Sequence, residues 1–511
     1  MSPSDAAAGS ERARPAFSRR EALAGAAALG GALLLGRRPG AARGEAPASH
    51  GQPRVAIVGA GLAGLTCAHR LRQHGVAATV YEAHDSRVGG RCWTARGFAG
   101  GQTAEHGGEF IDTAHRRIRA LAAELGLRLR DVGAIAARFP HLHPRIFLAG
   151  EVRRFDDVYR GAALLRRRAD RDRRRIGRFH WLRPSAAARA LDETSAEEWL
   201  TGAAPGRGHE LLRRAVRQYM AEEYGLDCDR LSAINMVLEF GSAGTESDER
   251  FHVEGGNDQL PWALAERLPA GALQLGQPLE RLRRSGSGYA LRFAGERRET
   301  SADVVVLCLP FTALRRVDLD GAGLGERRRR CIEQLGMGTN AKLLIGLRRP
   351  PGRYDRFDGE YFDERIDTWD SSLGEPGRGG VLTVYSGGRY GAAYRGPTHG
   401  PAPGSVVAEA LGRVERAVPG IAAGFAGRAW LDRWATDPWT LGSYAAYMPG
   451  QFTRFWGFAG LPEGGLHFGG EHTATEAQGY LEGAVRSGER CAREVAVRLG
   501  RAAAAPGGAR R

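Results

Sequence analysis

The sequence predicts an α/β fold, and three stretches of the chain carry that prediction. Residues 54–82 show the pattern of a buried strand, a glycine-rich turn, a helix and a second strand. Residues 302–310, ADVVVLCLP, form an apolar run typical of a buried strand. Near the C-terminus, LHFGG predicts a short strand that leads into a glycine turn and an amphipathic helix. With 511 residues, the chain is long enough for two interwoven domains.

The chain is strongly basic, with a formal net charge of +15. Its basic residues are spread along the chain and no nucleic-acid recognition motif is present, so we expect no nucleic-acid partner. The densest basic run, residues 164–179, is interrupted by aspartates and predicts a solvated helix face rather than a binding patch. A basic surface can still attract anionic membranes, so peripheral membrane contact stays open, as does a homodimer.

The six cysteines are far apart and show no C-x-x-C spacing, so the sequence predicts neither a zinc site nor a disulfide framework. Cys67 follows a glycine-rich turn and Cys308 lies within an apolar run, and both are expected to be small buried apolar residues. No metal site is predicted.

Residues 1–50 resemble a twin-arginine export signal. Arg19 and Arg20 precede a weakly apolar stretch from Ala22 to Leu35, and small residues suited to cleavage follow near residues 46–48. The apolar stretch is too short to cross a bilayer comfortably. We therefore expect export to the periplasm or beyond, with a disordered alanine-rich tail as the alternative.

The first chemical motif is VAIVGAGLAGL, which places Gly59, Gly61 and Gly64 in the spacing G-x-G-x-x-G between a strand and a helix. The glycines allow a tight turn, close approach of the backbone to a pyrophosphate, and close packing of helix on strand. The helix N-terminus, around Leu62 and Ala63, offers backbone N–H groups and a positive dipole end to phosphates.

Glu82 ends the second predicted strand, where an acid grips the ribose of a bound dinucleotide. The order of strand, glycines, helix, strand and acid predicts a Rossmann-like unit and leaves NAD and FAD open at this point. RVGGR, from Arg87 to Arg91, follows closely and resembles the element with which many FAD enzymes continue along the phosphates. Gly89 and Gly90 make room for backbone contact, and Arg91 can neutralise phosphate charge, so FAD is favoured.

Two further segments are expected at the cofactor. AEHGGEFID follows RVGGR, and its residues Gly108, Glu109 and Phe110 are expected near the flavin and the substrate. Near the C-terminus, a helix N-terminus at Tyr480 to Gly483 is expected to point at the flavin's N1/C2 edge and to stabilise the negative charge of reduced flavin. The expected cofactor-binding residues of this C-terminal block are Gly470, Glu471, Tyr480 and Leu481.

With these blocks the chain resembles the flavin-containing amine oxidase family, which includes monoamine, polyamine and L-amino-acid oxidases. The resemblance covers about residues 54–498 and is weak between about 130 and 250. It implies a Rossmann-like FAD-binding domain of the amine-oxidase (GR2) type, interleaved with an α+β substrate domain. The expected ranges are 51–130, 248–315 and 436–500 for the FAD domain, 131–247 and 316–435 for the substrate domain, and 501–511 for a disordered tail.

Lys342 is the only lysine of the chain, because every other member of its 73 Lys plus Arg is arginine. In the family a lysine on a strand of the substrate domain holds a water that hydrogen-bonds flavin N5, and GTNAKLLIGL matches that context. A compact ammonium can hold one water and lose its charge when desolvated, whereas a planar guanidinium cannot. The resemblance therefore implies a catalytic Lys342 that assists the reaction of reduced flavin with oxygen.

The segment RWATDPWTLGSYAAYMPG resembles the family's segment beneath the flavin. Ser443 stands where monoamine oxidases carry a cysteine bonded to the flavin, so we expect non-covalent FAD. Tyr444 and Tyr480 match the family's aromatic cage, in which two rings sandwich an amine. Tyrosines buried in a core are the alternative.

The resemblance implies oxidation of a C–N bond to an imine by hydride transfer to flavin N5, with O₂ reduced to hydrogen peroxide and the imine hydrolysed. An L-amino-acid oxidase is the main alternative and needs an arginine for the substrate carboxylate, but Phe110 stands near the place where some such enzymes carry it. A desaturase or porphyrinogen-type oxidase and a non-enzymatic FAD-binding protein are further alternatives. The identity of the amine, and whether oxygen or an electron carrier accepts the electrons, stay open.

Overall fold

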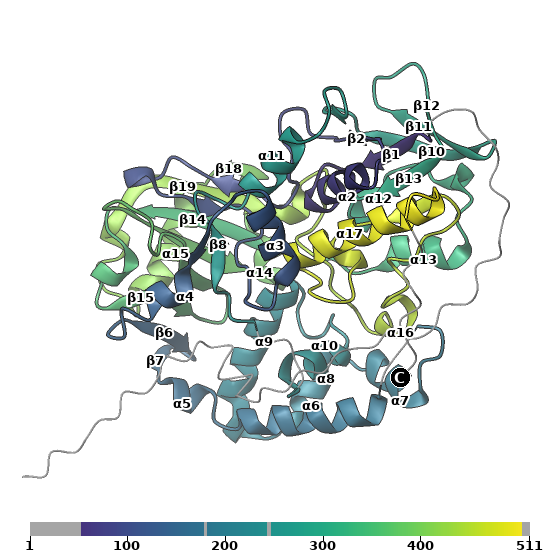
Figure 1. Cartoon of the computed structure of the whole chain (residues 1–511). Coiled ribbons are helices and arrows are strands. Elements are labelled where there is room, and N and C mark those ends of the chain that lie inside the picture. Colours follow the sequence, from purple (N-terminus) through teal and green to yellow (C-terminus); the bar gives the residue numbers. More distant parts are fainter. Residues whose placement is uncertain (1–52, 178–180, 243–246, 503–511) are drawn as a thin grey trace, which may run out of the picture.

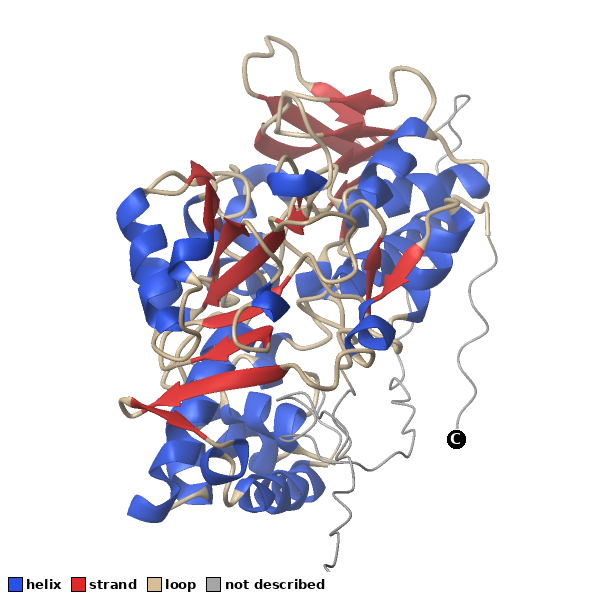
Figure 2. Ribbon diagram, turned by 90° about the vertical axis from the view of Figure 1, so that its left-hand side faces the viewer, coloured by secondary structure: helices blue, strands red, loops and turns tan. Residues whose placement is uncertain are grey.

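The computed structural model describes residues 53–177, 181–242 and 247–502. The predicted export signal lies outside the described residues, as does the predicted tail beyond residue 502. Within the described residues the chain forms two large sheets and a group of helices (Figures 1 and 2).

The first large sheet is parallel and follows the order β20–β13–β1–β2–β9. Four of its strands come from the stretches that predicted an α/β fold, which confirms the fold class. Its strands are β1 (Val55–Val58), β2 (Ala78–Tyr81), β9 (Leu273–Gln274), β13 (Val304–Leu307) and β20 (Leu466–Phe468).

Both faces of this sheet are covered by other elements of the fold. Alternate residues of each strand point to opposite faces and pack against different elements. Val55 and Ile57 pack into a core with helices α2 (Leu62–Gln73) and α17 (Leu481–Arg498). These two helices, from opposite ends of the chain, lie side by side (purple and yellow in Figure 1). The intervening strand residues pack against an antiparallel sheet of β10 (Leu279–Ser285), β11 (Gly288–Phe293) and β12 (Thr300–Ala302).

The second large sheet has the order β18–β19–β14–β17–β16–β15–β6–β7. Leu343 and Ile345 of its strand β14 pack against helix α15 (Gly404–Glu415). Leu344 on the opposite face packs on the hairpin of β3 (Thr94–Ala95) and β4 (Ala104–Glu105). The strands are β6 (His143–Leu148), β7 (Glu151–Arg153), β14 (Ala341–Leu347), β15 (Phe357–Phe362), β16 (Asp367–Asp370), β17 (Gly380–Ser386), β18 (His399–Pro401) and β19 (Phe425–Arg433).

A helical bundle lies beneath these sheets in Figure 1 and packs around the fully buried Trp199. The predicted solvated run at 164–179 largely forms α6, whose Leu165 and Ile176 are buried while most of its arginines lie at the surface. The bundle consists of α5 (Phe155–Val158), α6 (Ala162–Ile176), α7 (Ala186–Glu193), α8 (Ala196–Ala203), α9 (Glu210–Tyr224) and α10 (Ala233–Phe240).

Smaller elements complete the fold. All six cysteines are buried, as expected for Cys67 and Cys308. Among the described residues, no helix combines the length and apolar character that crossing a membrane requires. The other elements are α3 (Arg116–Glu124), β5 (Leu129–Asp131), α4 (Val132–Ala136), β8 (Phe251–Val253), α11 (Gln259–Glu266), α12 (Phe311–Leu314), α13 (Glu326–Gln334), α14 (Gly388–Ala393) and α16 (Phe452–Phe455).

Candidate active site

The glycine-rich turn after β1 forms an open cradle at the start of α2. Gly61 is the N-cap of α2 and has extended dihedral angles that any residue adopts. An added Cβ at Gly61 meets only the carbonyl oxygen of Gly89, 4.0 Å away, and one at Gly90 meets only the Cα of Gly61, 3.6 Å away. The glycines therefore leave space on the cavity side, where the first N–H groups of α2 are available to a phosphate.

Gly59 and Gly64 have a structural role in the same turn. Gly59 has a φ of +102°, and its added Cβ would lie 2.9 Å from the carbonyl oxygen of Cys308. A Cβ at Gly64 would overlap the carbonyl oxygen of Gly59, so only glycine lets the helix pack this closely on the strand. Gly64 is the one predicted cofactor-binding residue that does not line the cavity described below.

Glu82 follows β2 at the wall of the cavity, as predicted for a ribose-binding acid. Its carboxylate accepts hydrogen bonds from the backbone N–H groups of Ala60, at 2.7 Å, and His84, at 2.9 Å. Burial raises the pKa of Glu82, although these hydrogen bonds act in the opposite direction. The carboxylate thus ties the glycine turn to the end of β2.

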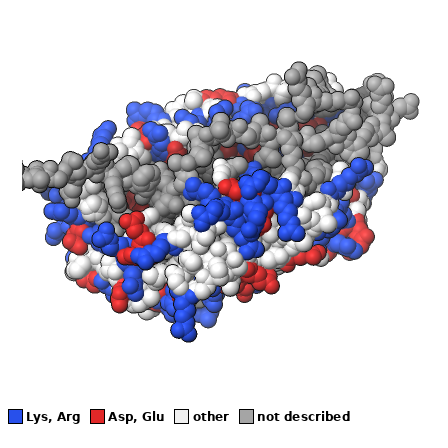
Figure 3. Space-filling model, turned by 90° about the horizontal axis from the view of Figure 1, so that it is seen from below, with Lys and Arg blue, Asp and Glu red and all other residues white. Residues whose placement is uncertain are grey.

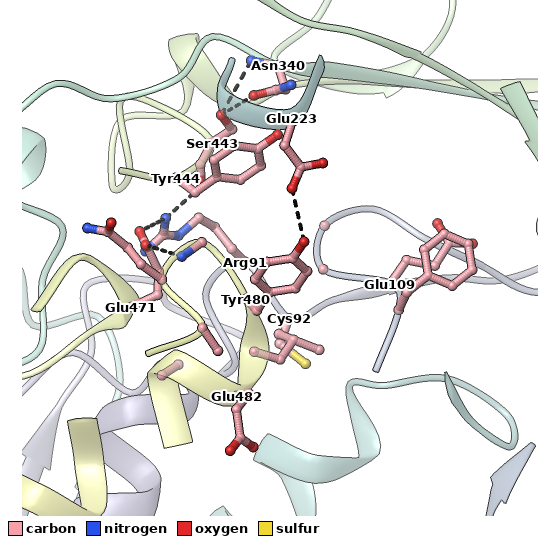
Figure 4. Close-up of a pocket in the computed structure, with 18 of the residues that line it drawn as sticks. Arg91, Cys92, Glu109, Glu223, Asn340, Ser443, Tyr444, Glu471, Tyr480 and Glu482 are labelled. Atoms are coloured by element: carbon pink, nitrogen blue, oxygen red, sulfur yellow. Dashed lines mark hydrogen bonds and ion pairs between the residues drawn. The ribbon is translucent and has the colours of Figure 1, made fainter. Parts of the chain in front are cut away.

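The two arginines of RVGGR have different surroundings. Arg87 donates to the carbonyl oxygen of Gly90 at 2.8 Å, within its own loop. Arg91, predicted to neutralise phosphate, donates to the carboxylate of Glu471 at 2.9 Å and to the carbonyl oxygen of Ser443 at 2.6 Å (Figure 4). Arg91 thereby joins the segment expected beneath the flavin to the C-terminal block, and its contact with a phosphate stays a prediction.

Lys342 is 5% exposed, and its three ammonium donors are all engaged. It donates to the carbonyl oxygens of Glu105, at 3.1 Å, and Gly107, at 2.8 Å, and to the carboxylate of Glu109, at 2.7 Å. Three acceptors from one five-residue segment surround a single nitrogen, and a planar guanidinium does not fit that arrangement. The geometry therefore explains why lysine, and not arginine, stands at this position, but it leaves no ammonium donor for the water that the resemblance implied.

Glu109, predicted to bind the cofactor, lines the cavity and forms an ion pair with Lys342; its contact with the cofactor stays a prediction. Its second carboxylate oxygen accepts from Trp369 Nε1 at 2.9 Å and from Ser371 Oγ at 2.7 Å. The ammonium also lies 5.1 Å from the centroid of the Trp369 ring. Lys342 and Glu109 thus form a fully hydrogen-bonded buried pair at the cavity wall.

An arc of aromatic side chains lines the cavity next to this pair. The ring of Phe110 lies 5.6 Å from that of Trp369, which lies 5.5 Å from that of Tyr385. The hydroxyl of Tyr385 is 2.9 Å from that of Tyr444, one of the two predicted cage residues. The structure thus joins the predicted Phe110 and Tyr444 through two residues that the sequence did not single out.

The two predicted cage tyrosines are held by the C-terminal end of α9. Tyr444 donates to the carbonyl oxygen of Glu222 at 2.6 Å, and Tyr480 donates to the carboxylate of Glu223 at 2.9 Å. Figure 4 shows Glu223 reaching to the Tyr480 hydroxyl. Burial raises the pKa of Tyr444 well above its usual value, so this hydroxyl stays protonated as a donor. Oxygen atoms of α9 therefore fix the orientation of both rings.

Ser443, which stands in place of the family's flavin-bonded cysteine, has a hydrogen-bond partner within the protein. Its hydroxyl donates to the side-chain oxygen of Asn340 at 2.6 Å. Asn340 in turn donates to the carbonyl oxygen of Glu222 at 2.7 Å, at the end of α9. The segment beneath the predicted flavin position is thus linked to the cage.

The predicted helix N-terminus is confirmed: α17 begins at Leu481 with Tyr480 as its N-cap. Gly108 lies against this end, because a Cβ there would be 2.8 Å from the side chain of Leu481. Gly470 precedes the paired Glu471, whose second carboxylate oxygen accepts from the N–H of Gly479 at 2.9 Å. The C-terminal block therefore meets the AEHGGEFID segment, as the sequence predicted.

One cavity of about 2040 Å³ connects all of these features. A ligand pocket for a small molecule is usually several times smaller, so this cavity has room for a dinucleotide together with a substrate. Among the described residues, no group of three or more His, Cys, Asp or Glu side chains is placed to hold a metal ion. The predicted site residues that line the cavity are Gly59, Gly61, Leu62, Ala63, Glu82, Arg87, Gly89, Gly90, Arg91, Gly108, Glu109, Phe110, Lys342, Tyr444, Gly470, Glu471, Tyr480 and Leu481.

Comparison with known proteins agrees with this geometry. Residues 62–496 match the family model described as flavin containing amine oxidoreductase. The chain is 26% identical over 482 residues to the putative flavin-containing monoamine oxidase AofH of Mycobacterium tuberculosis, covering 87% of this chain and 97% of that protein. It is 27% identical over 465 residues to the L-amino-acid oxidase of Mus musculus, covering 86% and 70% of the two chains.

The fold matches solved structures over most of the described chain. Cyclohexylamine oxidase from Brevibacterium oxydans superposes with a TM-score of 0.76 at 22% identity, covering 88% of this chain and all of that chain. A putrescine oxidase solved with putrescine gives a TM-score of 0.73 at 24% identity and covers 87% of this chain and 99% of that chain.

Proposed function

The chain belongs to the flavin-containing amine oxidoreductase family, and from that premise we propose that it oxidises a small-molecule amine with a non-covalently bound FAD. The family implies a flavin, and the residues present fit one: the cradle at Gly61 and Gly90 is open on the cavity side, and Glu82 stands at the adjoining wall. Gly61, Glu82 and Arg87 would hold the nucleotide part. When bound, the flavin accepts the hydride equivalent that leaves the carbon next to the amine nitrogen.

The overall reaction proposed is oxidation of the substrate's C–N bond to an imine, with O₂ reduced to hydrogen peroxide. Water then hydrolyses the imine to an aldehyde or ketone. The task of the protein is to orient the amine, exclude water from it and place a positive charge nearby. Tyr444 and Tyr480 orient the amine, and the Lys342 ammonium, fixed at the cavity wall, favours the reaction with oxygen.

One observation carries the choice of an amine over an amino acid: the cage tyrosine Tyr480 is hydrogen-bonded to the carboxylate of Glu223. A carboxylate at this place attracts a cationic amine and repels the carboxylate of an amino acid. The C-terminal end of α9 adds a negative dipole end in the same direction. Phe110, at the position expected for a carboxylate-binding arginine, lies against Trp369 and offers no charge.

The product balance tests this function. The purified holoenzyme is incubated with primary and secondary amines in air, and consumed oxygen, hydrogen peroxide and carbonyl product are measured. The proposal expects the three in equal amounts. If the protein reduces an artificial electron acceptor but consumes no oxygen, its natural electron acceptor is a carrier protein. The protein would then be a dehydrogenase rather than an oxidase.

Non-covalent binding has its own test. The proposal expects acid precipitation to leave all flavin in the supernatant, because the hydroxyl of Ser443 is no thiol and is already bonded to Asn340. Colour that stays with the protein pellet, or FMN rather than FAD in the supernatant by mass spectrometry, would contradict it.

The cellular location is proposed from residues 1–50, which lie outside the described residues. We propose export by the twin-arginine route, so replacing Arg19 and Arg20 by lysine should retain the protein in the cytoplasm. The arginines seen from below in Figure 3, where α6 lies, offer a basic face for peripheral contact with anionic membranes. Cofractionation with anionic vesicles tests that contact, and light scattering tests whether the protein forms the homodimer that the sequence leaves open.

A further inference from the structure

A chain of hydrogen-bonded histidine and aspartate side chains runs beside the strand that carries Lys342. Nδ1 of His106 lies 2.8 Å from one carboxylate oxygen of Asp432, and Nδ1 of His399 lies 2.7 Å from the other. Nε2 of His399 lies 2.9 Å from the carboxylate of Asp437. Asp437 lines the cavity, whereas Asp432 is fully buried. The chain therefore joins the protein interior to the cavity wall.

The geometry determines the charges of this chain. Both ring nitrogens of His399 face carboxylate oxygens, and a neutral imidazole can donate through only one nitrogen, so this geometry favours the charged form of His399. Burial lowers the pKa of His399, but its hydrogen bonds to Asp432 and Asp437 outweigh burial and raise it. Burial raises the pKa of Asp432, but the hydrogen bonds from His106 and His399 hold it below its usual value. Burial lowers the pKa of His106, which favours its neutral form, although its hydrogen bond to Asp432 acts in the opposite direction.

The chain and Lys342 hold the same short segment. Lys342 and Asp432 are direct partners in the β14–β19 pair, so their side chains share one face of the sheet. The ammonium of Lys342 is held in place by donating to the carbonyl oxygens of Glu105 and Gly107. The carboxylate of Asp432 binds the side chain of His106, which lies between those two residues. Removing the Asp432 charge therefore weakens the hydrogen bond that orients the residue between the two carbonyls.

Aromatic rings complete the hold on His106. Its ring stacks on Trp93 with 3.7 Å between centroids, and its carbonyl oxygen accepts from Trp434 Nε1 at 2.9 Å. The guanidinium of Arg87 lies 4.5 Å from the centroid of the same Trp93 ring. Burial raises the pKa of Asp437, at the other end of the chain, but the hydrogen bond from His399, with a smaller contribution from Arg87, holds it below its usual value. The segment that holds Lys342 is thus tied to the loop predicted to contact the cofactor.

A purely structural role accounts poorly for this arrangement. Buried charges are costly to desolvate, and apolar residues of similar size usually serve stability as well or better. Two carboxylates that alternate with two histidine rings instead give defined directions to the hydrogen bonds at His106 and His399. Such directionality is of use where a group must be held in a narrow range of positions.

We propose that His106, Asp432 and His399 are positioning residues that hold the Glu105–Gly107 carbonyls, and through them the Lys342 ammonium, for the reaction with oxygen. This inference rests on the proposed function, because it assigns the network to the oxidative half of that reaction. None of the three residues contacts the tyrosine cage in the described structure, so binding and oxidation of the amine should be spared.

The first test is structural and independent of activity. Asp432→Asn removes the charge that orients His106 and His399 while keeping the shape of the side chain. The inference expects a crystal structure of this holoenzyme variant in which Lys342 Nζ no longer hydrogen-bonds the carbonyl oxygen of Gly107. Unchanged contacts of Lys342 would overturn it. His399→Gln, one link further from the segment, provides a second variant if Asp432→Asn does not fold.

The second test separates the two halves of the reaction by stopped-flow absorbance. Asp432→Asn and His399→Gln should leave anaerobic reduction of the flavin by the amine within about twofold of the unaltered protein. They should slow reoxidation of the flavin by oxygen at least about tenfold, because even a small displacement of a catalytic group lowers the rate by such a factor. His74→Gln, at the C-cap of α2, is the matched histidine control and should change neither rate.

A double variant shows whether the network acts through the lysine. If it does, Lys342→Met with Asp432→Asn reoxidises no more slowly than Lys342→Met alone, because the shared effect is already lost. A reoxidation rate in the double variant that falls by the product of the two single-variant losses would overturn the inference. If no amine reduces the unaltered holoenzyme, the proposed function fails, and the crystal structure of Asp432→Asn alone decides whether the network positions Lys342.

Discussion

The hydroxyl of Tyr480 donates to the carboxylate of Glu223 at 2.9 Å, at the last turn of α9. A glutamate at a helix C-terminus faces the negative end of the helix dipole, which disfavours it for stability. Here the same charge stands beside a ring of the proposed amine cage. On the proposed function, this negative charge serves the binding of a cationic substrate.

Replacing Glu223 by Gln should therefore weaken amine binding while sparing the chemical step. The amide oxygen of Gln can still accept from Tyr480, so only the charge is lost. We expect KM to rise roughly fivefold with kcat nearly unchanged, as for loss of about 1 kcal/mol of charge attraction at a partly exposed site. Steady-state kinetics measure both values. Glu210→Gln, in the first turn of the same helix, is the control and should leave KM as it is.

The buried pair of Lys342 and Glu109 allows catalysis and stability to be separated. Lys342→Met leaves the Glu109 carboxylate buried without its cation, so we expect a loss of about 3 kcal/mol in stability together with slow reoxidation by oxygen. Adding Glu109→Gln removes the unpaired charge and should restore most of the stability but not the reoxidation rate. Thermal unfolding and stopped-flow oxidation measure the two effects. Normal reoxidation in the double variant would remove Lys342 from the mechanism.

Glu105 should make stability depend on pH. Burial, with a contribution from the charge of Glu109, raises its pKa from 4.5 to about 8. A carboxyl whose folded pKa lies above its unfolded value binds a proton on folding, so stability falls as pH rises from about 4.5 to 8. Glu105→Gln should remove this decline and be more stable than the unaltered protein at pH 9, by on the order of 2 kcal/mol.

Thermal unfolding of the holoenzyme at several pH values measures this effect. Glu151→Gln, at an exposed position of β7, is the control and should follow the unaltered protein at every pH. If stability plotted against pH gives parallel curves for Glu105→Gln and the unaltered protein, Glu105 is ionised throughout the range.

Gly61 offers a test of the cradle that does not disturb the fold. Its backbone angles suit any residue and an added Cβ meets no protein atom closer than 4.0 Å, so Gly61→Ala should fold normally. The methyl group nevertheless enters the space expected for the pyrophosphate, and we expect FAD affinity to fall at least about tenfold. Equilibrium dialysis of the apoprotein measures the affinity. Gly412→Ala in α15, also in open space, should bind FAD as the unaltered protein does.

Local patterns were sufficient to predict the elements that form the cofactor cradle. The turn at Gly61, the strand that carries Lys342 and the start of α17 at Leu481 each depend on residues close together in the sequence. Their types and approximate limits therefore follow from periodicity and glycine spacing. The resemblance to a family then supplied the expectation that they meet at one cavity.

The partners of these residues were not predictable in the same way. Tyr385 and Asp432 flank Lys342 only because β17 and β19 pair with β14 in one register, over separations of many residues. Glu223 comes from the stretch with the weakest resemblance to the family. The one local signal that was missed is the pair of glutamates in AEEYG, unfavourable at a helix end and thus a reason to suspect a function.

The central claim is that the cavity oxidises amines rather than amino acids, and matched pairs of donors test it most directly. Each pair differs only in a carboxylate, such as cadaverine with L-lysine and phenethylamine with L-phenylalanine. Each donor is mixed anaerobically with the holoenzyme, and loss of the flavin's visible absorbance is followed. We expect rapid bleaching by at least one amine and none by its amino-acid partner. Bleaching by the amino acids alone would contradict the claim and assign an L-amino-acid oxidase.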